Sequence, residues 1–106
     1  MKPLTLLETD CETFENKKEK SNVFIALAYT PTCGTCQLAK RIVSILAGTL
    51  NEADFVQINL NLNAQLAMEY GIFSVPALLI FKQNRHCETI FAFEMAVIYE
   101  KILKYI

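Results

Sequence analysis

The stretch of residues 23–36 reads VFIALAYTPTCGTC and contains the main structural and chemical patterns of the chain. Its first part, Val23–Tyr29, is a run of seven apolar residues that does not alternate in polarity. Such a run is typical of a strand that is covered on both faces. Its last part places two cysteines, Cys33 and Cys36, three positions apart, directly before a segment with helical periodicity. We therefore predict a central strand that leads into a Cys-x-x-Cys at the start of a helix.

The N-terminal side of this stretch predicts a strand and a polar helix. Leu4–Leu7 is a short apolar segment that suits an edge strand. Thr9 and Glu12 have the spacing of a capping box, in which a hydroxyl and a carboxylate satisfy unpaired amides at a helix start. We expect this helix to end near Lys20 and to bury Phe14 as its main inward contact.

On the C-terminal side, helical and strand patterns alternate. The residues between Lys82 and Arg85 form a polar connection that is short enough only for an antiparallel hairpin. The order β-α-β-α-β-α-β-β-α predicts an α/β fold in which a mixed central sheet is flanked by helices, with one domain over residues 1–106. The predicted elements are a helix from Cys33 to about Leu50, strand Phe55–Leu60, helix Asn63–Tyr70 closed by Gly71, strands Ala77–Phe81 and Glu88–Phe93, and a helix from Met95 to the end.

Two predicted helices have apolar faces that we expect to be buried. The first has Leu38, Ile42, Val43, Ile45, Leu46 and Leu50 at helical spacing, with Gln37, Lys40, Arg41 and Ser44 mostly outside the stripe. The last has Met95, Ile98, Ile102, Leu103 and Ile106.

Composition and charge exclude several classes of protein. Of the 106 residues, 53% are hydrophobic and 20% charged, which supplies a core and excludes intrinsic disorder. The formal net charge of −1 argues against nucleic-acid or anionic membrane partners. The longest apolar runs have seven residues, against about 18 for a membrane span. The first ten residues lack the apolar stretch of a signal peptide, so we expect a cytoplasmic location.

The two cysteines of the motif have complementary positions. Cys33, at the helix start, lies near unpaired backbone amides and the positive end of the helix dipole, which both favour a thiolate. Cys36 is about one turn further on, so its sulfur can reach Cys33 and close a small disulfide ring. The pair can therefore cycle between dithiol and disulfide with little movement.

The chain resembles the thioredoxin family in this motif and well beyond it. The likeness continues through Phe55–Asn59 and Leu66–Lys82 and covers essentially residues 1–106. It implies the thioredoxin fold, with Pro76 in a cis peptide bond beside the redox centre. It also implies that the backbone around Val75 pairs with the substrate.

The resemblance implies a thiol–disulfide oxidoreductase that reduces client disulfides. Cys33 is then the nucleophile and Cys36 the resolving thiol, and a flavin- and NADPH-dependent thioredoxin reductase recycles the pair. We expect no bound cofactor or metal, a redox-active Cys33–Cys36 disulfide, client proteins that contain disulfides, and a monomer. The substrate-binding positions carried over from the family are Thr32, Gly34, Thr35, Val75, Pro76 and Ala92.

Several positions depart from the family pattern. Leu27 and Gln57 stand where the family has a buried aspartate and its lysine partner, which leaves Cys36 without its usual acid–base group and predicts a slow resolving step. Thr35 stands where thioredoxins have proline, and its extra backbone N–H predicts a weaker reductant. The other departures are Thr32 for tryptophan, Arg41 for the proline that kinks the helix, and Ala92 for glycine.

Other functions remain open at this point. A thioredoxin-fold binding module without turnover would explain the lost tryptophan and charge pair, but it has no chemical need for both sulfurs. Oxidase or isomerase activity normally requires an oxidising compartment. A zinc site formed with His86 and Cys87 is disfavoured because adjacent residues cannot easily supply two ligands to one tetrahedral ion.

The remaining candidate groups have structural interpretations. Cys11 and Cys87 are expected to be small, partly buried hydrophobes, although oxidation or dimerisation through an exposed thiol is the alternative. His86 is expected in a solvent-facing turn and Tyr29 is expected to pack rather than react. The phenylalanines Phe73, Phe91 and Phe93 are expected to line the core or the substrate groove.

Overall fold

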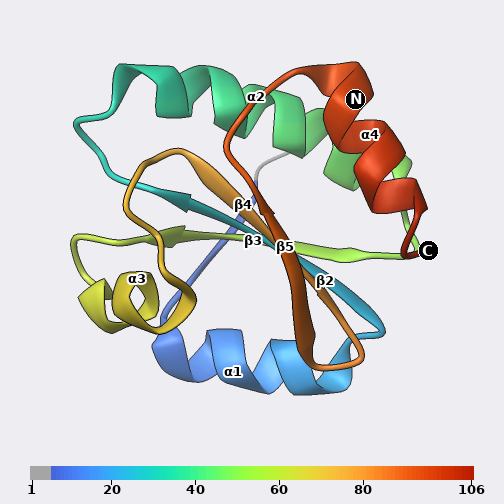
Figure 1. Cartoon of the computed structure of the whole chain (residues 1–106), viewed down its shortest axis with the longest axis horizontal. Coiled ribbons are helices and arrows are strands. Elements are labelled where there is room, and N and C mark those ends of the chain that lie inside the picture. The colour runs from blue at the N-terminus through green and yellow to red at the C-terminus, as the bar shows by residue number, and fades with distance from the viewer. Residues whose placement is uncertain (1–5) are drawn as a thin grey trace.

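Strand β2 (Val23–Tyr29) lies in the middle of a five-stranded mixed sheet, and all seven of its residues are buried. The computed structural model describes residues 6–106 and places helices on both faces of this sheet (Figure 1). The apolar run therefore forms the fully covered strand that it predicts. The other elements are β1 (Leu7–Thr9), α1 (Cys11–Lys20), α2 (Gly34–Thr49), β3 (Asp54–Asn59), α3 (Ala64–Tyr70), β4 (Ala77–Lys82), β5 (Arg85–Ile90) and α4 (Met95–Leu103).

The strand order is β1-β3-β2-β4-β5. Strand β3 pairs in parallel with both β1 and β2, whereas β2 with β4 and β4 with β5 are antiparallel pairs. The β4–β5 connection is a tight hairpin in which Gln83 and Asn84 have φ of 50° and 67°, the left-handed values of a hairpin turn. Because β1, β3 and β2 are parallel, their C-terminal ends lie at the same end of the sheet, where α2 begins.

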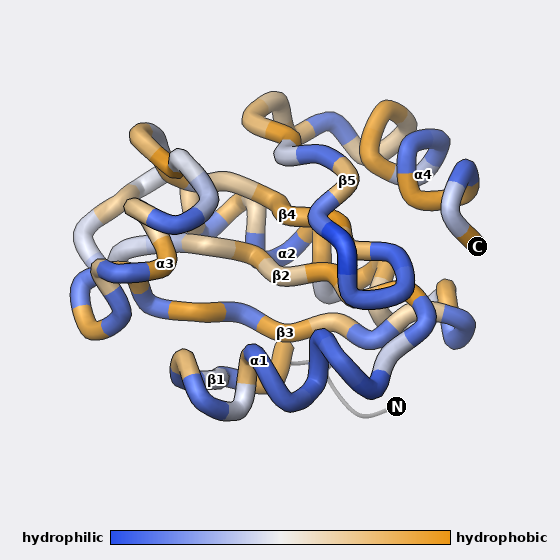
Figure 2. The backbone as a smooth tube through the Cα atoms, turned by 60° about the horizontal axis from the view of Figure 1, so that its bottom comes forward, coloured by the Kyte–Doolittle hydropathy of each residue, from blue (hydrophilic) through white to orange (hydrophobic). Residues whose placement is uncertain are grey.

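Two cores lie on opposite faces of the sheet. Helices α2 and α4 cover an aliphatic core that includes Leu27, Val43 and Ile98. Helices α1 and α3 cover the other face, where Phe14 and Phe81 form an edge-to-face pair with ring centroids 5.6 Å apart. In Figure 2 the tube of α1 is mostly hydrophilic, because Phe14 is the one buried residue of that helix. No helix within residues 6–106 has the length and apolar character to cross a membrane.

The start of the chain differs from the prediction at two points. The first strand is Leu7–Thr9 rather than Leu4–Leu7; Leu4 lies outside the described residues. The N-cap of α1 is Asp10, whose carboxylate accepts from the Thr13 N–H at 2.8 Å, so the capping box at Thr9 is wrong. Thr9 still pairs with Ile58 in the sheet, which keeps it in the strand.

The C-terminal predictions are also shifted. Strand β5 starts directly after the turn and ends at Ile90, so Phe91 and Phe93 belong to the following loop. Helix α4 ends at Leu103 rather than at the last residue. The expected buried faces are too wide, because five of their residues are exposed: Leu38, Ile45, Met95, Leu103 and Ile106.

Candidate active site

The first turn of α2 has an open N-terminus. Cys33 occupies the N-cap position, with extended backbone angles of φ −84° and ψ 113°, and makes no side-chain hydrogen bond to the turn's amides. Its own N–H donates to the Thr30 carbonyl at 3.2 Å, which holds the loop against the end of β2. The first amides of α2 therefore remain available to an anion at Cys33.

The Cys33 sulfur is half-buried and lies among polar groups. It is 3.4 Å from the Thr35 hydroxyl oxygen and 3.9 Å from the Val75 carbonyl oxygen. The neighbouring Cys36 thiol first, then the Thr35 hydroxyl, and then the nearby backbone N–H groups of both residues lower the pKa of Cys33 below its ordinary value of 9.0. These donors favour the thiolate, which is the nucleophilic form.

The second cysteine has the opposite environment. Cys36 is 1% exposed, and burial first, followed by its hydrogen bond to Cys33, raises its pKa to about 11. All four cysteines of the chain are free thiols in this structure. The motif thus combines an accessible sulfur that ionises readily with a buried neighbour that remains protonated.

The loop between α3 and β4 lies against this pair. Its Val75–Pro76 peptide bond is cis, and the Val75 carbonyl faces the Cys33 sulfur. Thr32, Gly34 and Thr35 are exposed around the sulfur. The structure therefore gathers the predicted positions of the motif and of the proline loop at one end of the sheet.

Two exposed phenylalanines join this loop to the one after β5. Phe73 and Phe91 stack with ring centroids 5.6 Å apart at an interplanar angle of 30°. Phe73 is 88% exposed, so it is not a core residue. The stack brings exposed Ala92, the residue after Phe91, to the neighbourhood of the proline loop.

The two positions that lack the family's buried charge pair adjoin in the sheet. Leu27 of β2 is fully buried and is the register partner of Gln57 in β3. The Gln57 amide nitrogen donates to the Leu6 carbonyl at 3.0 Å, which turns the side chain toward the N-terminal strand. Neither residue supplies an ionisable group to Cys36.

A polar contact that the sequence does not predict involves Lys40, whose charge lowers the pKa of Cys36. The Lys40 ammonium nitrogen is 3.7 Å from the centroid of the Tyr29 ring, and the Tyr29 hydroxyl donates to a Glu8 carboxylate oxygen at 2.6 Å. Tyr29 is buried, as expected for a packing residue. The available signal was the spacing of Lys40, four residues after Cys36 on the same helix.

The other thiols and the histidine lie elsewhere. Cys87 is exposed, so its expected partial burial is wrong, whereas Cys11 is half-buried as predicted. His86 is exposed but belongs to β5 rather than to a turn, and its ring lies 5.3 Å from that of Phe81. Within residues 6–106, no three His, Cys, Asp or Glu side chains are grouped as metal ligands.

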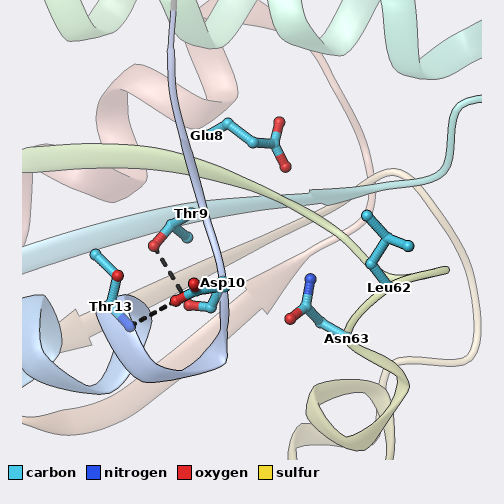
Figure 3. A pocket seen from close by; sticks show the side chains of 6 residues that line it. All are labelled: Glu8, Thr9, Asp10, Thr13, Leu62 and Asn63. Atoms are coloured by element: carbon cyan, nitrogen blue, oxygen red, sulfur yellow. Dashed lines mark hydrogen bonds between the residues drawn. The ribbon is translucent and has the colours of Figure 1, made fainter.

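A hollow of about 400 Å³ lies at the junction of β1 and α1 (Figure 3). Glu8 and Asp10 are on its wall, together with Leu62 and Asn63 from the loop after β3. Glu8 both lines this hollow and accepts the hydrogen bond from the Tyr29 hydroxyl. The carboxylate bonded to Tyr29 is therefore open to solvent.

Comparison with known proteins agrees with this geometry. The Thioredoxin family model matches residues 5–106. The thioredoxin-like protein YusE of Bacillus subtilis is 37% identical over 84 residues, which cover 78% of this chain and 79% of that protein. The chloroplastic M-type thioredoxin of Chlamydomonas reinhardtii is 33% identical over 98 residues, covering 90% of this chain and 70% of that protein.

Solved structures show the same fold. A mutant thioredoxin from Halobacterium salinarum NRC-1 superposes with a TM-score of 0.89 at 25% identity, covering 99% of this chain and 94% of that one. Plasmodium falciparum thioredoxin gives a TM-score of 0.88 at 15% identity, covering 95% and 100%. The mixed sheet flanked by four helices is therefore the thioredoxin fold, and the family as a whole is one of thiol–disulfide oxidoreductases. On its sequence and its structure, the chain belongs to the thioredoxin family.

Proposed function

We propose that the protein reduces disulfides in client proteins by dithiol exchange through Cys33 and Cys36. The observation that carries the proposal is the position of the Cys33 sulfur at an uncapped helix N-terminus, one turn before the buried Cys36 and facing the Val75 carbonyl. This arrangement stabilises a thiolate at the surface and keeps a second thiol within its reach.

The exchange has two steps. The Cys33 thiolate attacks one sulfur of the client disulfide, and the other client sulfur leaves as a thiolate that takes a proton from water. Cys36 then loses its proton and attacks the Cys33 sulfur, which breaks the mixed disulfide and releases the second client sulfur. The client gains two electrons and two protons, and the protein retains a Cys33–Cys36 disulfide.

The surroundings of Cys33 supply the substrate contacts of this proposal. The exposed positions Thr32, Gly34 and Thr35 surround the sulfur, exposed Ala92 follows the Phe91 that stacks on Phe73, and the Val75–Pro76 segment offers its backbone to an extended client segment. The hydroxyl and N–H of Thr35 both lower the pKa of Cys33. They stabilise the reduced form and support a weaker reductant than thioredoxins with proline at this position.

The proposal extends to partners and location. A thioredoxin reductase would return the disulfide to the dithiol, so this chain would need no bound cofactor of its own. We place this cycle in the cytoplasm, where thiols are kept reduced. The protein would act as a monomer, because one chain supplies both sulfurs.

Two measurements test the proposed function. With dithiothreitol as electron donor, the protein should accelerate insulin disulfide reduction. When the prereduced Cys36→Ser variant is mixed with insulin after the dithiothreitol is removed, it should accumulate a mixed disulfide on Cys33 that mass spectrometry detects. A binding module without turnover would give no acceleration and no mixed disulfide. That result would overturn the proposal in favour of the binding function, for which the loss of the Leu27 and Gln57 charges is the supporting observation.

A further inference from the structure

The resolving thiol Cys36 needs to lose a proton. The two positions at which the family has a buried aspartate and its lysine partner carry no charge in this chain. Leu27 is buried hydrocarbon and Gln57 is a neutral amide that bonds to Leu6. Burial raises the pKa of Cys36 to about 11, so few molecules have this sulfur as a thiolate at neutral pH. Another group close to Cys36 therefore has a large influence on the second step of the exchange.

The side chains of Glu8, Tyr29 and Lys40, which come from three different elements, are linked by contacts. Glu8 of β1 accepts from the Tyr29 hydroxyl of β2 at 2.6 Å, and Lys40 of α2 lies 3.7 Å over the Tyr29 ring. Glu8 is also the register partner of Gln57, which in turn pairs with Leu27. The carboxylate thus lies in the same row of the sheet as the missing charge pair, two strands from Leu27 and toward the edge.

The helix geometry directs Lys40 toward Cys36. Residues four apart on a helix share one face, and a helical side chain extends back over the turn that precedes its own Cα. The turn before Lys40 is the one that contains Cys36. The Tyr29 ring holds the ammonium by a cation–π contact, and Tyr29 adjoins Thr30, whose backbone N–H, like the Lys40 charge, lowers the pKa of Cys36.

The Tyr29 phenol is suited to hold this cation. Burial first, and then the bond to Glu8, raises the pKa of Tyr29 to about 12, so the ring stays a neutral hydrogen-bond donor. The ring therefore presents its electron-rich face to Lys40 while its hydroxyl is anchored by a carboxylate. The contact thus holds in place the Lys40 charge, which lowers the pKa of Cys36.

We propose that Lys40, fixed by Tyr29 and Glu8, is a positioning residue for the resolving step that stabilises the Cys36 thiolate in place of the absent buried charge pair. This inference rests on the proposed function and deepens it. The proton of Cys36 goes to water, the Cys36 thiolate attacks the Cys33 sulfur, and the client thiolate leaves. Lys40 exchanges no proton in this step, and its charge acts on the attacking sulfur alone.

Formation of the mixed disulfide increases the influence of the Lys40 charge on the ionisation of Cys36. Among the described residues, the titratable groups that act on Cys36 are Cys33 and Lys40. Lys40 in turn contacts Tyr29 of β2, whose hydroxyl bonds to Glu8 of β1. In the free dithiol, the Cys33 thiolate opposes ionisation of Cys36. In the mixed disulfide that charge is gone, which leaves the Lys40 ammonium to favour the thiolate.

A two-phase assay separates the two cysteines. In a Cys11→Ser, Cys87→Ser background, reaction with dithiobis-nitrobenzoic acid releases one coloured thiol when Cys33 attacks and a second when Cys36 resolves the adduct. We expect Lys40→Met to leave the first phase unchanged and to slow the second about 3- to 10-fold at neutral pH, with its pH midpoint displaced upward. Lys40→Arg, which retains the charge, should restore the second phase.

Arg41→Met is the matched control, because it removes the same charge from the next, exposed position of α2. It should leave both phases unchanged. The proposal is overturned if Lys40→Met has the second phase and pH midpoint of the parent, or if Arg41→Met slows it equally. A parent protein that stops after the first release would overturn the proposed function, and this inference with it.

Discussion

Helices α1 and α2 both follow a strand, but their N-termini are completed in different ways. At α1, the Asp10 carboxylate accepts from the Thr13 N–H at 2.8 Å. At α2, the same N-cap position is held by Cys33, whose side chain makes no such bond. A carboxylate is a strong cap, whereas a thiol leaves the helix amides unsatisfied until it ionises. The difference shows where local stability has been given up in favour of reactivity.

The two helices also differ in how they are attached to the sheet. Helix α1 buries Phe14 alone, whereas α2 buries four residues: Cys36, Ala39, Val43 and Leu46. A well-capped helix thus has a single apolar anchor, and an uncapped helix has a broad one. The open end of α2 is tolerated because packing along the rest of the helix keeps it in place.

The largest effect is expected from capping α2. Cys33→Ser places a hydroxyl at the N-cap, where serine is among the preferred residues. Disulfide reduction should fall to background, and the Tm should rise by a few degrees because the first-turn amides gain an acceptor. Calorimetry and the insulin assay on the same sample measure both. A Tm that falls when activity is lost would contradict the description of α2 as a helix whose first-turn amides lack an acceptor.

The next effect concerns the anchor of α1. Phe14→Ala should reduce the free energy of unfolding by about 3–5 kcal/mol, because it empties the centre of the aromatic core. Phe73→Ala removes the same atoms from a side chain that is 88% exposed, and it should change the free energy of unfolding by less than about 0.5 kcal/mol. Urea denaturation measures both. Similar losses in the two variants would contradict the single-anchor description of α1.

A smaller effect is expected at Thr35, which follows the open cap. Thr35→Val removes the hydroxyl near Cys33, and Thr35→Pro removes the backbone N–H as well. Both should raise the pKa of Cys33 and make the protein more reducing, by about 2- to 10-fold in the equilibrium constant with glutathione and more for proline. Unchanged equilibrium constants would mean that Cys36 alone sets the thiolate's stability.

The smallest effect is expected from the cap of α1. The Thr13 N–H lowers the pKa of Asp10 below its ordinary value of 3.8, so the cap's contribution is present above that value and is lost as pH falls through the lower folded pKa. Asp10→Ala should lower the Tm at neutral pH by a few degrees. Asp10→Asn should retain the cap but remove this part of the acid dependence. A Tm that is identical for all three proteins would contradict the role of the cap.

The sequence predicts the parts of this comparison that depend on local patterns. The run Val23–Tyr29 predicts β2 to the residue, and the motif predicts Cys33 at the start of α2. The choice between Thr9 and Asp10 as the α1 cap could not be made this way, because both residues can cap. Pairing of Thr9 with Ile58, a contact distant in sequence, makes the choice.

Other features could not be predicted because they depend on several elements together. The apolar Phe91 and Phe93 suggested a late strand, but the tight turn at Gln83 and Asn84 starts β5 at Arg85. The Lys40–Tyr29 contact depends on how α2 is oriented about its axis relative to the end of β2. No spacing rule within one segment contains that information.

Cys33 and Cys36 have opposite acidities because one lies at an open helix end and the other is buried. Alkylation of the reduced protein by iodoacetamide, followed across pH by mass spectrometry of each cysteine, tests it directly. We predict that Cys33 reacts with a midpoint below 9.0 and that Cys36 reacts only near a midpoint of about 11. Equal midpoints, or a Cys36 that reacts before Cys33, would contradict the claim.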